Sequence, residues 1–244
     1  MNKVCPELGD QQMITTNAQA KVRLYDKLNL HYNIVAQAVY SARGRAGSPF
    51  GDEFLRYLVA ALISFDMGRM MGKGARRRYL PEEGGFAARL RSKLTELEPV
   101  LSPVATCSLA ESDIREVSKN VSHAYSVLAL GGPSSLNENQ DDFHVGASKI
   151  LHFVNPDMFL IVDSNAATAY REVHRVDFRK STQPGYSCQR YLACLDEGQK
   201  DILAYGLGAF RALDPATPIA RIYDKLAFVT GQEFKQLQEN GPES

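Results

Sequence analysis

Apolar residues recur at spacings of three and four along most of the chain, a period that is typical of amphipathic α-helices. The first series runs through Val22, Tyr25, Leu28 and Tyr32 and decays in the Gly- and Pro-containing stretch after residue 44. Because Gly and Pro interrupt helices, the pattern predicts one long helix from about residue 18 and then a loop.

A second helix is predicted from Asp52, at the start of "DEFLRYLVAALISFDMGRMMGKG". Acids stand at its beginning and bases toward its end, as the helix dipole prefers. Residues 57–65 are nearly all apolar. A helix that is apolar on almost every side belongs in the middle of a protein.

The remaining periodic segments make the chain mainly α. Helices are predicted over 86–98, ending before Pro99, and over 111–130, and two more periodic segments follow in the last third of the chain. Only "MFLIV" (158–162) has the composition of a strand or of an extended buried segment. We therefore expect a compact multi-helix domain with little or no sheet.

The length of 244 residues suits one domain of this kind. We expect it to cover residues 16–232, between flexible tails at 1–15 and 233–244. A division into two lobes, at about 16–130 and 131–232, stays open.

The charge balance narrows the choice of partners. Lys and Arg together number 28, as do Asp and Glu, so no global field draws the chain to nucleic acid or to an anionic membrane. Any site for a polyanion must then be a local patch. The four cysteines show no CxxC spacing and no zinc-type grouping with histidine, so we expect a reduced chain without a metal site.

The first residues, "MNKVCPELGDQQM", lack the apolar core of a signal peptide. No stretch of the sequence approaches the roughly 18 apolar residues that are needed to span a bilayer. We therefore expect a cytoplasmic protein with no membrane partner.

One lysine and one aspartate bracket the apolar run in "GASKILHFVNPDMFLIVDSNAATAYR", residues 146–171. Gly146 and Ser148 are typical of a helix start, which places Lys149 in the first turn. The helix dipole and the apolar neighbours both disfavour a charged ammonium there and so lower its pKa, which favours a nucleophile. Asp163 precedes a second segment with the composition of a helix. At that helix start its carboxylate would accept hydrogen bonds from backbone N–H groups, which would keep it ionised.

Both residues also have purely structural interpretations. Lys149 is then an exposed helix lysine, and Asp163 is an N-cap that stabilises its helix by about 1 kcal/mol. The spacing of the two residues does not decide between these interpretations.

The segment "VGASKILHFVNPDMFLIVDSNAATAYR" resembles the helix-hairpin-helix DNA glycosylase superfamily, in particular the 8-oxoguanine DNA glycosylase-like fold, as a divergent bacterial member. In that family a hairpin glycine leads to a helix with the catalytic lysine, and an extended segment delivers the catalytic aspartate. The matching positions are Gly146, Lys149 and Asp163. The later "PIARIYDKLAFVTG" resembles a closing helix of some members, with Arg221 and Asp224 at its polar positions.

Three departures from the family pattern bear on base specificity first and on lyase activity second. The fuller Leu-Pro-Gly-x-Gly hairpin is not reproduced, and the interval from Lys149 to Asp163 is shorter than in the standard enzymes. The closing helix also lacks the expected tryptophan, since the chain has none.

The resemblance implies an enzyme that removes a damaged or modified base from DNA and needs no cofactor. Lys149 would attack C1′ of the nucleotide and Asp163 would orient the lysine and stabilise the cationic sugar, with AP lyase activity through a Schiff base. The base must enter a pocket, for which His144, His152 and Phe153 are candidates. The alternative for Phe153 is a core residue, and for the two histidines a surface or hydrogen-bonded core residue.

Phosphate contacts are expected at two places. The basic loop after the second helix carries Lys73, Arg76, Arg77 and Arg78, side chains of the kind that bind phosphates, although a solvated loop has the same composition. Backbone N–H groups near Gly146 and Ser148 are the second place, as at other helix N-termini.

Two other functions stay open beside the glycosylase. The same fold can serve as a non-catalytic module that binds nucleic acid or protein, or the chain can be an unrelated helical regulatory protein. The sequence does not indicate the oligomeric state.

Overall fold

The structure, a computed structural model, describes residues 13–46, 50–65, 85–129, 136, 143–178 and 186–240. Within these residues it contains ten α-helices, one 3₁₀ helix and no strand, which confirms the expected mainly α fold. The helices are α1 (Ala18–Leu28), α2 (Leu30–Ala46), α3 (Asp52–Phe65), α6 (Phe86–Leu101), η1 (Ser102–Val104), α7 (Ile114–Ala129), α8 (His144–Val154), α9 (Ser164–His174), α10 (Tyr186–Tyr205), α11 (Leu207–Arg211) and α12 (Ile219–Glu239). None of these described helices is long and apolar enough to cross a membrane.

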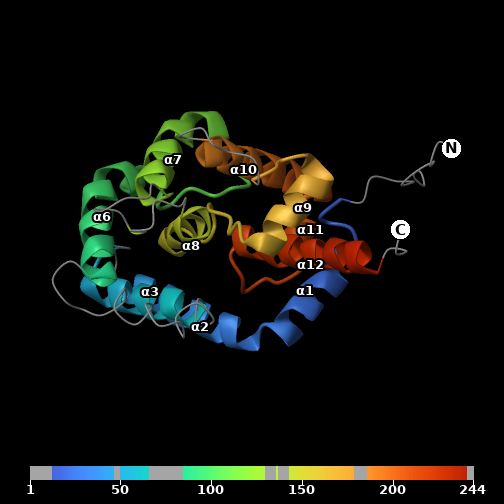
Figure 1. Ribbon diagram of the computed structural model, residues 1–244, viewed down its shortest axis with the longest axis horizontal. Helices are drawn as coiled ribbons and strands as arrows, with labels where there is room; N and C mark the ends of the chain where they lie inside the picture. The colour runs from blue at the N-terminus through green and yellow to red at the C-terminus, as the bar shows by residue number, and fades with distance from the viewer. Residues whose placement is uncertain are drawn as a thin grey trace.

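Helix α8 lies at the centre of the arrangement. It packs against α2, α3 and α7, and Figure 1 shows α6, α10, α9 and α12 around it in the same view. Its residues Ile150, Leu151, Phe153 and Val154 are fully buried. Lys149 therefore projects from a helix inside the bundle.

The long helix expected from residue 18 is two helices that meet at Asn29. Asn29 has φ −120° and ψ 37°, outside the helical region, and its side-chain amide donates to the carbonyl of Tyr25 at 3.1 Å. Asn side chains compete in this way with helical hydrogen bonds, so the chain bends there. The bend lets Tyr25 on α1 and Tyr32 on α2 line the same cavity.

Several boundaries differ from the expected ones. Helix α6 continues through Pro99 to Leu101. The extension buries Leu101 fully. Pro99 has no N–H to donate to the carbonyl of Thr95, but Thr95 is exposed, so water can donate to this carbonyl instead. At the two ends of the domain, Ile14 is fully buried and α12 continues to Glu239.

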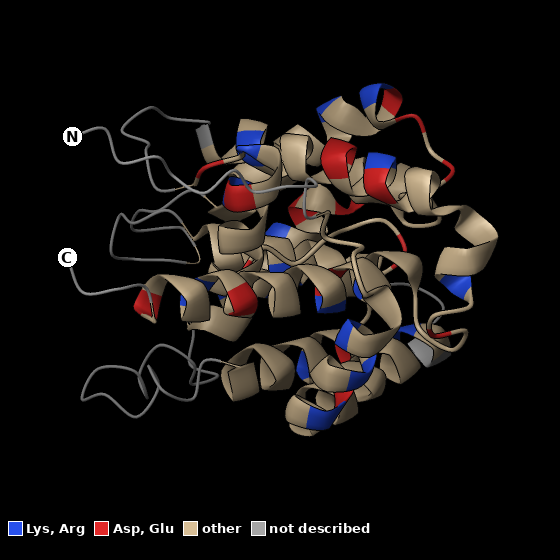
Figure 2. Cartoon of the chain, turned by 90° about the vertical axis from the view of Figure 1, so that its right-hand side faces the viewer, with Lys and Arg blue, Asp and Glu red and all other residues tan. Residues whose placement is uncertain are grey.

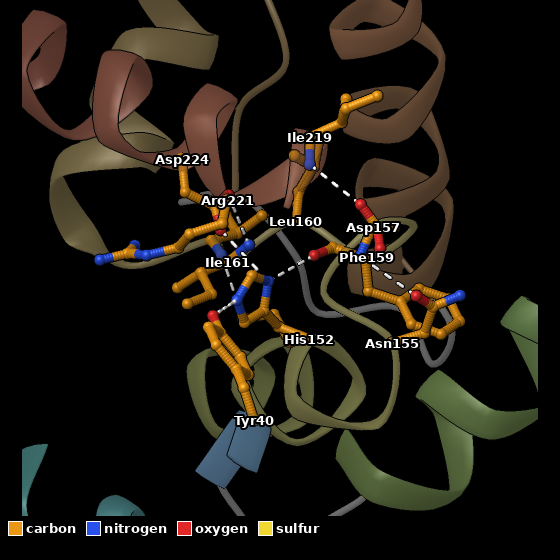
Figure 3. Close-up of polar contacts among 12 residues, drawn as sticks. Tyr40, His152, Asn155, Asp157, Phe159, Leu160, Ile161, Ile219, Arg221 and Asp224 are labelled. Atoms are coloured by element: carbon orange, nitrogen blue, oxygen red, sulfur yellow. Dashed lines mark hydrogen bonds and ion pairs between the residues drawn. The ribbon is translucent and has the colours of Figure 1, made fainter. Parts of the chain in front are cut away.

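The segment 158–162, "MFLIV", is buried without being part of a strand. Side chains bond its backbone instead. The N–H groups of Ile161 and Val162 donate to Asp224 at 2.8 Å and to Ser148 at 3.1 Å. The carbonyls of Phe159 and Leu160 accept from His152 at 2.7 Å and from Tyr191 at 3.0 Å. Since buried backbone groups need partners, these four side chains supply the hydrogen bonds that neighbouring strands would supply in a sheet. Figure 3 shows the contacts of His152 and Asp224.

A glycine allows α12 to approach the first turn of α9. A Cβ added at Gly231 would lie 1.9 Å from the backbone oxygen of Asn165. Only backbone atoms stand there, so the contact cannot be relieved by a change of rotamer. The absence of a side chain at this position therefore helps to place Asp163, the N-cap of α9.

We expect Gly231→Ala to lower the free energy of unfolding by about 1–3 kcal/mol, because the added methyl group overpacks two helices. Gly208→Ala is the matched control, since nothing lies within 4 Å of a Cβ at that helical position. The control should be as stable as the parent or slightly more stable. Urea denaturation of the three proteins measures the difference, and equal losses in both variants would contradict the packing argument.

Candidate functional site

Lys149 and Asp163 line one cavity of about 160 Å³. Asp163 ends the irregular segment in an extended conformation and is the N-cap of α9. One of its carboxylate oxygens accepts from the N–H groups of Asn165 and Ala166, each at 2.9 Å. The predicted N-cap is thus confirmed, and its bonds hold the carboxylate at the cavity wall.

Lys149 is five residues beyond His144, the first residue of α8. The expected first-turn position was wrong, because the helix begins at His144 rather than at Gly146. The helix dipole acts mainly within the first turn, so it has little effect on this ammonium. Its Nζ lies 5.2 Å from the centroid of the Phe65 ring, a cation–π distance.

Aromatic rings form much of the cavity wall. Tyr32 stacks on Phe65 with ring centroids 4.0 Å apart, and Tyr25 meets Phe228 edge to face at 5.2 Å. These rings come from α1, α2, α3 and α12. The sequence did not single them out for a site, because helix periodicity marks such residues only as core.

Arg221 also lines the cavity, although only 4% of its surface is exposed. Its guanidinium carbon lies 4.8 Å and 4.4 Å from the ring centroids of Tyr25 and Tyr32. One terminal nitrogen donates to the Tyr25 hydroxyl at 2.7 Å and to Asn33 at 3.3 Å. The charge is therefore fixed in place by two rings and two acceptors.

His152 is fully buried next to the cavity and does not line it. Its Nδ1 donates to the carbonyl of Phe159, so in the neutral ring Nε2 accepts from the Tyr40 hydroxyl at 2.7 Å. Burial, together with the nearby charge of Arg221, lowers the pKa of His152 to about 3. Figure 3 shows Tyr40, His152 and Asp224 in this chain of contacts.

Asp224 shares the cavity wall with Arg221 and is likewise 4% exposed. Burial raises its pKa well above the usual range, and the charge of Arg221 and the Ile161 N–H act in the opposite direction. Arg221 and Asp224 stand three residues apart on a helix whose neighbouring positions are buried. The sequence signal is a set of charged residues within an apolar stretch of helix, which here also includes the buried Lys225, and it marks buried charges rather than a site.

The structure does not place Gly146 and Ser148 at the surface. Both are buried, and the Ser148 hydroxyl donates to Val145 and accepts from Val162. A Cβ at Gly146 would overlap the ring of Phe143, so this glycine serves close packing. Neither residue is in a position to hold a phosphate.

The three pocket candidates also lie elsewhere. Phe153 and His152 are fully buried and do not line the cavity, and Phe153 stacks behind Phe65 at 6.1 Å. His144 is half-buried and stacks on Phe178 at 5.9 Å. The basic loop residues Lys73, Arg76, Arg77 and Arg78 lie outside the described residues.

The pH dependence of stability should report on His152. Between pH 6.5 and about 3 the unfolded chain protonates this histidine and the folded protein does not, so its contribution to stability is complete above pH 6.5 and is lost as the pH falls. The raised pKa of Asp224 acts with the opposite sign, since its contribution is lost as the pH rises.

We expect acidification below pH 6.5 to destabilise the parent more steeply than His152→Gln, by up to about 1.4 kcal/mol for each pH unit. Thermal unfolding across this range measures both slopes. His123→Gln, at an exposed histidine, is the control and should follow the parent. Parallel curves for the parent and His152→Gln would show that His152 does not titrate in this way.

The site thus combines an amine, an anchored carboxylate, a fixed guanidinium and a ring-sized space. No group of His, Cys, Asp or Glu that could hold a metal ion occurs in the part of the chain that the structure describes. Comparison of the chain with protein-family models, with curated proteins and with solved structures finds no match.

Proposed function

We propose that the protein is a DNA glycosylase with AP lyase activity, in which Lys149 is the nucleophile and Asp163 orients it. One observation carries the proposal: two residues that are 14 positions apart, on α8 and at the start of α9, line the same cavity. A purely structural lysine and an ordinary N-cap have no need of a common cavity.

The chemistry follows from these two groups. In its unprotonated form the amine attacks C1′ of the nucleotide, and the C1′–N bond breaks with its electron pair leaving on the base, which takes up a proton. Loss of a proton from nitrogen and opening of the sugar give a Schiff base. Removal of a proton from C2′ then expels the 3′ phosphate. The Asp163 carboxylate stabilises the positive charge that develops on the sugar as the base departs.

The size and walls of the cavity support a base as its occupant. A cavity of about 150 Å³ accommodates one benzene ring, and this one measures about 160 Å³. Its aromatic walls suit a base that has left the stack. The amine that would attack the sugar lies at the same cavity.

Apolar side chains flank the residues that line the cavity on the α1–α2 bend. Leu28 and Leu30, on either side of Asn29, are 57% and 64% exposed. Proteins that distort DNA insert such side chains between base steps. In Figure 2 basic and acidic residues mix along the helices, so phosphate contacts would be local rather than spread over one charged face.

Borohydride trapping tests the nucleophile. With DNA that carries the right base, the parent should give a reduced covalent adduct, and Lys149→Gln should give none, because only a Schiff base is reduced to a stable amine. Lys119→Gln, at an exposed lysine of α7, is the matched control and should retain the adduct. An adduct that persists in Lys149→Gln would remove Lys149 from the mechanism.

The panel of oligonucleotides should contain oxidised, alkylated, deaminated and phage-type modified bases. Absence of both adduct and base release across this panel would favour a non-catalytic binding module on the same fold.

Asp163→Asn separates the charge of this residue from its capping role. Asn is as good an N-cap as Asp, so the free energy of unfolding should change by less than about 1 kcal/mol. The rate of base release should fall by at least about 100-fold, since the developing cation loses its carboxylate. Single-turnover kinetics and urea denaturation give the two values. An unchanged rate would reduce Asp163 to a structural cap.

A further inference from the structure

Arg221 presents hydrogen-bond donors to the cavity that the protein does not use. A guanidinium has five N–H bonds, and the side-chain hydrogen bonds of Arg221 to Tyr25 and Asn33 both come from one terminal nitrogen. Among the residues that the structure describes, its other terminal nitrogen and Nε have no acceptor, and no carboxylate forms an ion pair with it. Buried charges are normally paired, so an acceptor supplied by a ligand would complete this site.

The unused donors can be reached from the cavity. Arg221 lines the cavity although only 4% of its surface is exposed. The polar side-chain atoms that are completely covered and lack a partner in the described part of the chain include Oδ2 of Asp224 and the hydroxyl of Tyr32, but no nitrogen of Arg221. The two unbonded nitrogens therefore keep contact with open space, and a ligand in the cavity can accept hydrogen bonds from them.

The guanidinium is held in position before any ligand binds. Its carbon lies 4.4 Å from the ring centroid of Tyr32, which itself stacks on Phe65, and its hydrogen bonds to Tyr25 and Asn33 fix its orientation. A charge that is fixed in advance stabilises an opposite charge that develops beside it without a cost of reorganisation. Because a guanidinium stays protonated in proteins, Arg221 can bind an anion but does not give it a proton.

We propose that Arg221 makes the cavity selective for a ring that carries negative charge, and that in the proposed reaction this ring is the departing base. The inference rests on the proposed function for the identity of the ring. As the C1′–N bond breaks, its electron pair passes to the nitrogen of the base, which is an anion until it takes a proton from water. Asp163 then stabilises the cationic sugar, and Arg221 donates to acceptor atoms of the anionic base, at one cavity.

Ionisation of a ring-shaped acid in the cavity tests this selectivity without any catalysis. 4-Nitrophenol has one ring, and its absorbance reports whether its hydroxyl is ionised. Charge-assisted hydrogen bonds should favour the anion over the neutral acid at least about tenfold. The pKa of 4-nitrophenol should then be lower by at least about 1 in its complex with the whole protein. NMR shifts of residues that line the cavity, such as Ala166, identify the binding site.

Arg221→Met should abolish this preference, because Met fills a similar space without a charge or an N–H group. Arg115→Met, at an exposed arginine of α7, is the matched control and should bind 4-nitrophenol like the parent. Equal preference in the parent and in Arg221→Met would contradict the inference. So would an unchanged pKa of 4-nitrophenol in the parent, or no binding at the cavity, and these two measurements need no variant to fold.

Base release measures the same charge in the reaction. Arg221→Met should slow single-turnover release by at least about 100-fold. The loss should be larger for bases that are poorer leaving groups, since more negative charge then needs to be stabilised. A loss of the same size for every base would make Arg221 a structural residue, and an unchanged rate would remove it from the reaction; either result overturns the inference.

The outcomes separate this inference from the proposed function. A preference for ionised 4-nitrophenol that depends on Arg221, without base release or a borohydride adduct by the parent, would keep the anion selectivity and reject the glycosylase. Base release by a parent protein that has no preference for the ionised probe would do the reverse.

Discussion

The structure depends on one constraint, which is that a buried segment without a sheet must still bond its backbone. Residues 158–162 lie in the core, and one backbone group in each of the last four residues is bonded by a side chain, from Ser148, His152, Tyr191 or Asp224. Each unpaired buried group would cost about 1–3 kcal/mol. The side chains that prevent this loss come from α8, α10 and α12, so they also fix where the segment delivers Asp163.

This constraint explains why the lysine and the aspartate share a cavity. Ser148 precedes Lys149 in the chain, and its hydroxyl accepts from the N–H of Val162, which precedes Asp163. One hydrogen bond thus joins the immediate neighbours of the two residues. An interval of 14 residues is sufficient because the connection between α8 and α9 crosses back over α8 instead of extending away from it.

The features that depend on neighbouring residues in the chain could be predicted from the sequence, and the features that depend on tertiary contacts could not. Asp163 as an N-cap follows from a polar residue before a helical composition, and the all-helical class follows from periodicity. The start of α8 was misplaced because Gly146 is explained by contact with Phe143, which no helix-start rule contains. The aromatic walls were missed because Tyr25 and Tyr32 have the same spacing as core residues, and only the bend at Asn29 places them at a cavity.

The buried pair on α12 shows how structural and chemical roles coincide. A charge inside a protein is costly unless it is paired and hydrogen-bonded, yet Arg221 and Asp224 are both buried and do not form an ion pair with each other. One oxygen of Asp224 accepts from the N–H of Ile161, and one terminal nitrogen of Arg221 donates to Tyr25 and Asn33. A core that needed only stability would be served better by apolar residues of similar size. The two residues therefore serve the site more than the stability of the core: Arg221 places a fixed positive charge at the wall of the cavity, and Asp224 bonds the Ile161 N–H beside it.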